Sequence, residues 1–143
     1  MAVTPGGWAS VVAVPAKEVP MTATRWSILL TIALATAIAI LTLIPPTQVD
    51  MPSGSDKLSH FIAFLALALP LGIVRPRWSG VLFLLFTTFG AAIEIIQPYV
   101  GRSRELPDLI ADMTGIACGM ALGLLVRRLS PGLSGRAASG MEN

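Results

Sequence analysis

Four acidic or amide side chains flank one polar loop in a chain that is otherwise strongly apolar. Glu94 and Gln97 lie three residues apart at the end of one apolar segment. Asp108 and Asp112 lie four residues apart at the start of the next. Each pair shares one helical face, since residues three or four apart are neighbours on a helix. An ionisable residue costs roughly 2.5 to 3.5 kcal/mol at the centre of a membrane span, so groups kept together here indicate a protein-lined, partly wet site.

An earlier apolar segment begins with polar groups of a different kind. Asp56 and His60 lie four residues apart and share a helical face, with Lys57 beside them. In the polar loop, Arg102 offers a planar guanidinium that suits a phosphate or a carboxylate. The candidate binding residues are therefore Asp56, Lys57, His60, Glu94, Gln97, Arg102, Asp108 and Asp112.

Three apolar segments bring an ionisable group to a similar depth. Counted from the nearer end of each segment, His60, Glu94 and Asp112 lie four or five residues inward, or about 6 to 8 Å of helix. We therefore predict that the second, third and fourth apolar segments converge on one polar pocket.

The composition shows what kind of element positions these groups. The 143 residues are 54% hydrophobic and only 13% charged, with a mean hydropathy of +0.75, which is too apolar for a soluble domain of this size. We predict an all-α membrane protein, a small bundle of four transmembrane helices. The predicted spans are residues 26–44, 57–74, 78–96 and 107–126.

The lengths of these segments suit a bilayer, with one exception. Residues 26–44 are 19 uncharged residues, enough to cross about 30 Å of hydrocarbon at about 1.5 Å per residue. In the last segment only residues 113–126 are free of charge, so its insertion needs partner helices. The chain is thus expected to have a flexible N-terminal leader at 1–24, one four-helix domain at 25–128 and a flexible cytoplasmic tail at 129–143.

The distribution of cations predicts the orientation. The leader, the loop at 75–77 and the tail contain seven Lys or Arg residues, whereas the other two loops and the adjoining helix ends contain three. Because Lys and Arg are retained on the cytoplasmic side, we predict that both termini lie inside and that the polar pocket faces outward.

Small residues mark a packing face on the last span. Gly115, Gly119 and Gly123 lie within about 80° of Asp108 and Asp112 at about 100° per residue. Glycines spaced by four residues let another backbone approach closely. We therefore expect the face with the two aspartates to be buried against a neighbouring helix.

Other classes of protein are disfavoured. A net charge of +2 is too small and too scattered to indicate nucleic-acid binding. The single cysteine, Cys118, excludes an intramolecular disulfide and a Cys-ligated zinc site. We assign no cofactor and no resident metal from the sequence, and the oligomeric state stays open.

The polar residues occur in an order that resembles the VanZ-like family. The chain reads DKLSHFIAF at 56–64, EIIQ at 94–97, GRS at 101–103 and DLIADMTGIACG at 108–119. The resemblance covers roughly residues 26–128, with Asp112 at a position where the family often has Asn. The matching positions are Asp56, Lys57, His60, Phe61, Glu94, Gln97, Gly101, Arg102, Asp108, Asp112 and Gly115.

The resemblance implies a small multi-pass protein of the bacterial cytoplasmic (inner) membrane. The named relative in that family is associated with resistance to teicoplanin-type glycopeptides, but no settled biochemical activity comes with it. Such drugs act on cell-wall precursors at the outer face of the membrane, which agrees with an outward pocket. The expected partners are the lipid bilayer and a cell-wall precursor or lipid head group.

Three functions fit these residues. The first is a binding or envelope-modifying protein whose pocket holds a polar head group or a glycan-linked lipid. The second is a membrane-embedded enzyme, with His60 and Glu94 as acid and base, or with a divalent metal among His60, Glu94, Asp108 and Asp112. The third is proton-coupled transport, although nothing ionisable continues inward from the predicted pocket.

Overall fold

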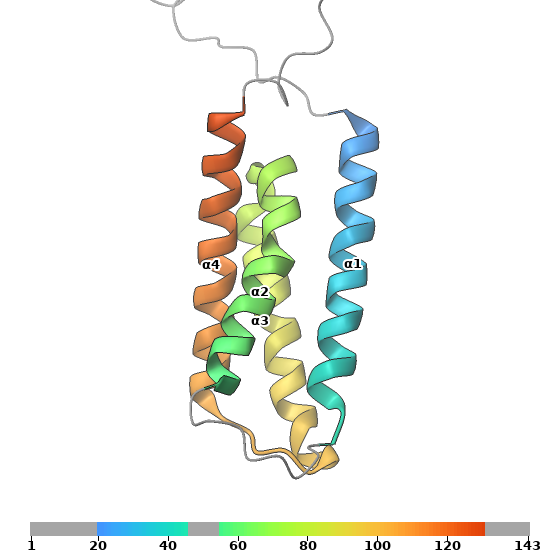
Figure 1. Cartoon of the computed structure of the whole chain (residues 1–143), viewed down its shortest axis with the longest axis vertical. Helices are drawn as coiled ribbons and strands as arrows, with labels where there is room; N and C mark the ends of the chain where they lie inside the picture. Colours follow the sequence, from blue (N-terminus) through green and yellow to red (C-terminus); the bar gives the residue numbers. More distant parts are fainter. Residues whose placement is uncertain (1–19, 46–54, 131–143) are drawn as a thin grey trace, which may run out of the picture.

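The computed structural model describes residues 20–45 and 55–130, which form four long helices (Figure 1). The described residues contain no strand. The helices are α1 (Met21–Leu43), α2 (Ser55–Val74), α3 (Ser79–Ile96) and α4 (Leu106–Leu129), with short 3-10 helices η1 (Pro76–Trp78) before α3 and η2 (Gln97–Val100) after it. All four long segments are apolar and long enough to cross a membrane. The prediction of an all-α protein with four candidate spans is therefore confirmed, and the chain has the make-up of a multi-pass membrane protein.

The predicted boundaries differ most at the first helix. α1 begins at Met21, so the last four residues of the expected leader, 21–24, are helical rather than flexible. The length of the uncharged run alone predicts a start that is too late. A helix also satisfies the backbone hydrogen bonds of polar residues, so it can continue beyond the apolar run. Leu129, expected in the tail, is the last residue of α4. Residues 1–19 and 131–143 of the expected leader and tail lie outside the described residues.

Proline and glycine lie at several helix boundaries. Arg75 precedes Pro76 and has a non-helical backbone, with φ −132° and ψ 60°, which ends α2. Gly101 has a positive φ of 81°, and this left-handed residue turns the chain from η2 toward α4. Pro107 lies in the first turn of α4, where its missing N–H is harmless.

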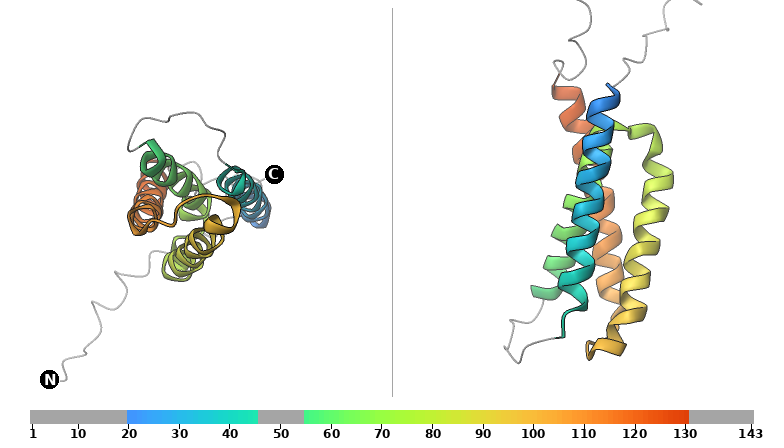
Figure 2. Two further views of the ribbon diagram at one scale, coloured as in Figure 1. Left: turned by 90° about the horizontal axis from the view of Figure 1, so that it is seen from below. Right: turned by 90° about the vertical axis from the view of Figure 1, so that its right-hand side faces the viewer.

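The most extensive helix contact in the bundle joins α2 and α4, which pack along their length (Figure 1). α3 packs against α4, and α1 packs mainly against α2 (Figure 2). Within the described residues α1 makes no contact with α4. The fully buried apolar residues at the centre are Phe64, Leu67, Ala68 and Ile116.

The three glycines of the predicted packing face lie at the contact between α2 and α4. A Cβ atom on Gly115 would meet the backbone oxygen of Phe61, and one on Gly119 would meet that of Leu65. A Cβ atom on Gly123 would lie 2.7 Å from the carbonyl carbon of Gly72. The two backbones approach so closely that only glycine fits at these positions.

The polar residues gather at one end of the bundle. The start of α1 and the end of α4 both lie at the opposite end of the bundle, on its two sides (Figure 1). There Arg75 donates a hydrogen bond to the Thr24 hydroxyl at 3.1 Å, which links α1 to the end of α2. The polar end contains the end of α1, the start of α2 and the segment from η2 to α4.

Candidate functional site

A buried histidine–aspartate pair joins α2 and α4. His60 of α2 is 3% exposed and Asp112 of α4 is fully buried, with 2.9 Å between His60 Nδ1 and Asp112 Oδ1. An ionised Asp112 can only accept a hydrogen bond, and in that state His60 Nδ1 is the donor. The close approach at Gly115, one turn further along α4, brings the two helices near enough for this bond. His60 Nε2 is left without a hydrogen-bond partner among the described residues.

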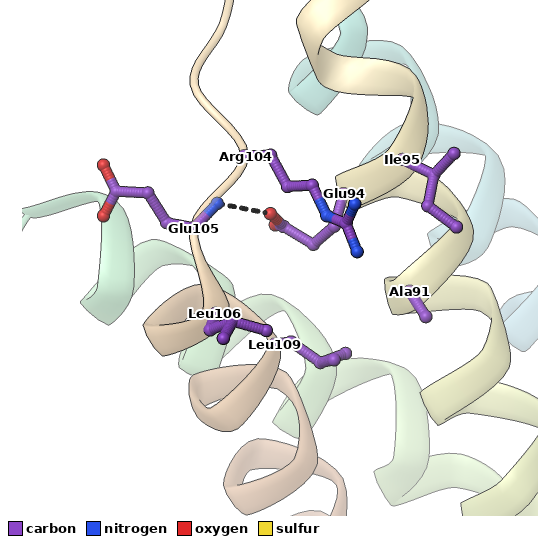
Figure 3. A pocket seen from close by; sticks show the side chains of 7 residues that line it. All are labelled: Ala91, Glu94, Ile95, Arg104, Glu105, Leu106 and Leu109. Atoms are coloured by element: carbon purple, nitrogen blue, oxygen red, sulfur yellow. Dashed lines mark hydrogen bonds between the residues drawn. The ribbon is translucent and has the colours of Figure 1, made fainter.

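Glu94 comes from α3 and fixes the segment that leads into α4. Its Oε2 atom accepts a hydrogen bond at 3.0 Å from the backbone N–H of Glu105 (Figure 3). Glu94 is only 3% exposed, and its other oxygen, Oε1, has no hydrogen-bond partner in the described part of the chain. One carboxylate oxygen is therefore structural, while the second is available for a ligand.

Lys57 connects α2 to the start of α4. Its Nζ atom donates to Glu105 Oε2 at 3.0 Å and lies 3.7 Å from Oδ1 of the buried Asp108. The hydrogen bond from Lys57, together with one from the Ser103 hydroxyl, lowers the pKa of the Glu105 carboxyl below its usual value of 4.5. Glu105 lies before α4, and its side chain points away from Glu94 (Figure 3).

Arg102 is held in place by contacts from two other helices. One guanidinium nitrogen donates to Asp56 Oδ1 at 3.2 Å, and another donates to the backbone oxygen of Thr42 at 3.5 Å. The turn at Gly101 directs Arg102 back over the bundle. The Arg102 backbone N–H donates a hydrogen bond to the backbone oxygen of Gln97 at 3.1 Å. The side chain of Arg102 remains 24% exposed, so part of its donor capacity faces open space.

A cleft of about 340 Å³ lies between α1 and α2 beneath Arg102. Its wall is apolar along the two helices, and polar groups surround its end at Arg102. The lining residues are Ile38, Leu41, Thr42, Asp56, Ser59, His60, Ala63, Phe64 and Arg102.

A much smaller cavity of about 40 Å³ lies on the other side of the cluster, between α3 and α4 (Figure 3). It is bordered by Ala91, Glu94, Ile95, Arg104, Glu105, Leu106 and Leu109. The second, third and fourth spans do bring His60, Glu94 and Asp112 together, while a single open pocket between these spans stays a prediction. The two cavities described here border the polar cluster on either side.

Seven of the eight predicted binding residues fall into three groups, and Gln97 lies apart from them. His60, Glu94 and Asp112 form a buried cluster from three helices. Lys57 and Asp108 lie beside each other, and Asp56 and Arg102 pair at the rim of the cleft. Gln97 is 1% exposed within η2, and its side-chain oxygen has no hydrogen-bond partner among residues 20–45 and 55–130.

Gly90 is a part of the cluster that the sequence analysis missed. A Cβ atom at this position would lie 2.6 Å from Asp112 Oδ2 and 3.2 Å from Cζ of Phe64. Gly90 and Glu94 lie four residues apart on α3, so helical spacing could have placed both on the face toward α4. The contribution of Thr42 is a backbone oxygen, which no pattern of side chains indicates.

Two sets of side chains in the described residues could hold a metal ion, because one N or O atom from each member lies within 4.8 Å of the others. One set is His60, Glu94 and Asp112, all buried, and the other is Asp56, His60 and Asp108. The same residues could do acid–base chemistry, since Asp112 orients the His60 ring. In α4 no charged residue or histidine lies between Asp112 and Arg127, so this helix offers no ionisable group to continue a proton relay toward the other end of the bundle.

No protein-family model, curated protein or solved structure matches this chain.

Proposed function

We propose that the chain is a protein of the bacterial cytoplasmic membrane, with both termini inside, that binds an anionic lipid of the cell envelope in the cleft between α1 and α2. We also propose that the chain is related to the VanZ-like family, which its sequence resembles. From that relationship we expect a role in the response to teicoplanin-type glycopeptides. The observation that carries it is the two-part lining of the cleft. Apolar side chains form the wall, and a guanidinium lies at the polar end.

The lining of the cleft matches an amphiphile. Ile38, Leu41 and Phe64 offer an apolar surface for hydrocarbon, whereas Thr42 and Ser59 lie with Arg102 among the polar lining groups. A lipid that enters between the helices can bury its chain along this wall and bring its head group to Arg102. A volume of about 340 Å³ is within the usual range of about 300 to 1,000 Å³ for ligand sites.

Arg102 is suited to an anionic head group because it is already positioned. Asp56 and the Thr42 oxygen each take one of its donors, which leaves other N–H groups of the planar fork for phosphate or carboxylate oxygens. Holding a flexible side chain before the ligand binds lowers the entropy cost of binding. Arg102 is thus the residue on which affinity should depend most.

The test is crosslinking of purified protein in nanodiscs with a photoactivatable phospholipid and, separately, a photoactivatable polyprenyl phosphate. A hydrogen bond to a charged group is worth about 1.5 to 3 kcal/mol, so Arg102→Gln should weaken binding about tenfold to a hundredfold. Arg104→Gln is the control, with the same change of charge on an exposed residue two positions along the same loop. Equal crosslinking of both variants and the wild type would refute the head-group site.

The two lipid probes distinguish the source of the head group. Stronger labelling by the polyprenyl phosphate supports a lipid-linked cell-wall precursor as the ligand, and stronger labelling by the phospholipid supports a bulk membrane lipid. In cells, Arg102→Gln should change sensitivity to lipid-bearing glycopeptides at unchanged protein level, while Arg104→Gln should not. Wild-type sensitivity of Arg102→Gln at normal protein level would count against the link to glycopeptides.

A second candidate function is hydrolysis of the bound lipid, and the buried His60–Asp112 pair favours it. A histidine whose ring is oriented by a carboxylate is a common general base, and His60 also lines the cleft. Release of the head group from the lipid should then stop in His60→Ala while binding persists through Arg102. If the purified protein releases no head group from either lipid, the binding function stands and the enzymatic one does not.

A further inference from the structure

We propose that His60, Glu94 and Asp112 bind a divalent transition-metal ion at the polar end of the bundle. The three residues come from α2, α3 and α4, and one ligand-capable atom of each lies within 4.8 Å of the other two. This metal site is independent of the head-group proposal, because it can form whether or not a lipid occupies the cleft.

Charge is the first reason. Glu94 is 3% exposed and Asp112 is fully buried, and a buried carboxylate without a compensating charge costs several kcal/mol. Lys57 does not supply that charge, because its nitrogen bonds Glu105 and faces Asp108. Within residues 20–45 and 55–130 Glu94 forms no ion pair. A divalent cation between the two carboxylates would offset the cost for both.

Unsatisfied atoms are the second reason. Glu94 Oε1 and Asp112 Oδ2 are each buried without a hydrogen-bond partner among the described residues. Buried polar atoms are nearly always bonded, so two such carboxylate oxygens in one cluster indicate a missing ligand. The other oxygen of each carboxylate is fixed by a hydrogen bond, so both carboxylates are oriented before an ion arrives.

The ring nitrogen of His60 that faces Asp112 is Nδ1, which lies 2.9 Å from Asp112 Oδ1. An ion held by both residues would take the place of the proton between these two atoms, because a histidine ligand binds through an unprotonated nitrogen. The neutral imidazole would then carry its proton on Nε2. Glycine at position 90 leaves room at the carboxylate, since a Cβ atom there would lie 2.6 Å from Asp112 Oδ2.

The ligand set limits the choice of metal. One imidazole nitrogen with two carboxylates suits Zn²⁺ or Mn²⁺ better than Mg²⁺ or Ca²⁺, which prefer oxygen ligands alone. Tetrahedral ligands at about 2.1 Å from Zn²⁺ lie about 3.4 Å apart, so side-chain rotations that draw the three atoms together by little more than 1 Å complete the site. Three protein ligands leave a position for water or a substrate oxygen, as in catalytic zinc sites.

The alternative set of Asp56, His60 and Asp108 is less suited. Asp56 is exposed and already paired with Arg102 at 3.2 Å, and Asp108 has Lys57 at 3.7 Å. Cations at both carboxylates would repel a metal ion. An ion has access to the favoured set because His60 also lines the cleft.

The test begins with tag-free or Strep-tagged protein that has been stripped with a chelator, reloaded with Zn²⁺ or Mn²⁺ and desalted. Elemental analysis of the wild type should find one ion per chain. Glu94→Gln and Asp112→Asn should each lower the affinity at least about a hundredfold, since loss of even an outer partner costs about 10- to 100-fold. Asp56→Asn is the matched control and should keep the ion.

A second measurement uses the fact that the chain has one histidine. In wild-type protein loaded with Cu²⁺, pulsed EPR should detect the remote nitrogen of a coordinated imidazole, and that nitrogen can only belong to His60. This result needs no variant to fold. Failure of the wild type to retain any ion, absence of the imidazole signal, or loss of metal in Asp56→Asn but not in Glu94→Gln would each overturn the proposal.

Discussion

Replacing Gly90 by alanine should destabilise the protein although alanine is the better helix former. The new Cβ atom would lie 2.6 Å from Asp112 Oδ2, so the carboxylate must move, and its bond to His60 at 2.9 Å moves with it. Phe64 lies 3.2 Å from the same position and blocks the simplest shift. A single methyl group should therefore disrupt the polar cluster.

The magnitude follows from three contributions. Overpacking costs about 1 to 3 kcal/mol, and loss of a hydrogen bond to a charged group costs about 1.5 to 3 kcal/mol. Replacing glycine by alanine within a helix stabilises the helix by about 1 kcal/mol, which offsets part of this loss. The expected net loss for Gly90→Ala is about 1.5 to 5 kcal/mol, against a typical total stability of about 5 to 15 kcal/mol.

The control is Gly80→Ala, the same substitution in the same helix, because a Cβ atom on Gly80 meets nothing within 4 Å. Unfolding in mixed detergent micelles, followed by tryptophan fluorescence, should show Gly80→Ala equal to or slightly more stable than the wild type. In an Asp112→Ala background Gly90→Ala should cost less, because the blocking oxygen is gone and the two sites are in contact. If Gly90→Ala and Gly80→Ala, each in otherwise wild-type protein, have the same unfolding midpoint, the close contact with Asp112 is refuted.

Three further predictions concern packing, orientation and pH. Gly119→Leu should lower both the amount of protein in the membrane and its thermal stability, because the backbone of α2 leaves no room for a side chain there. Ala121→Leu, at an exposed position, should be tolerated, and equal behaviour of the two variants would contradict the packed face. In a cysteine-free background, a cysteine at Ser103 should react with an impermeant thiol reagent from outside and one at Ser79 only after permeabilisation; the reverse pattern overturns the proposed orientation. The ion pair lowers the pKa of Glu105 below 4.5, so its stabilisation is present above pH 4.5 and is lost as the pH falls through the lowered value. The difference in unfolding midpoint between the wild type and Glu105→Gln should therefore vanish in acid, and a constant difference would show that the pair does not titrate as expected.

Hydropathy was enough to predict the four helices. Runs of apolar residues set the length of each span, and this feature needs no partner from elsewhere in the chain. The same holds for the glycine face of α4, since a spacing of four residues puts its members on one side of a helix whatever packs there. Local rules failed at Met21–Thr24, where a helix extends past the apolar run.

Which polar atoms meet was decided only by the tertiary structure. Helical spacing placed His60, Glu94 and Asp112 at one depth, but their rotation about each helix axis depends on how α2, α3 and α4 pack. Because α2 packs against α4, His60 contacts the carboxylate of Asp112. Glu94 instead accepts a hydrogen bond from the backbone N–H of Glu105. The cleft depends on α1, whose contribution beside Arg102 includes a backbone oxygen at Thr42. Such a contact has no signature along the chain, because its partners lie 60 residues apart and one of them is a main-chain atom that every residue has.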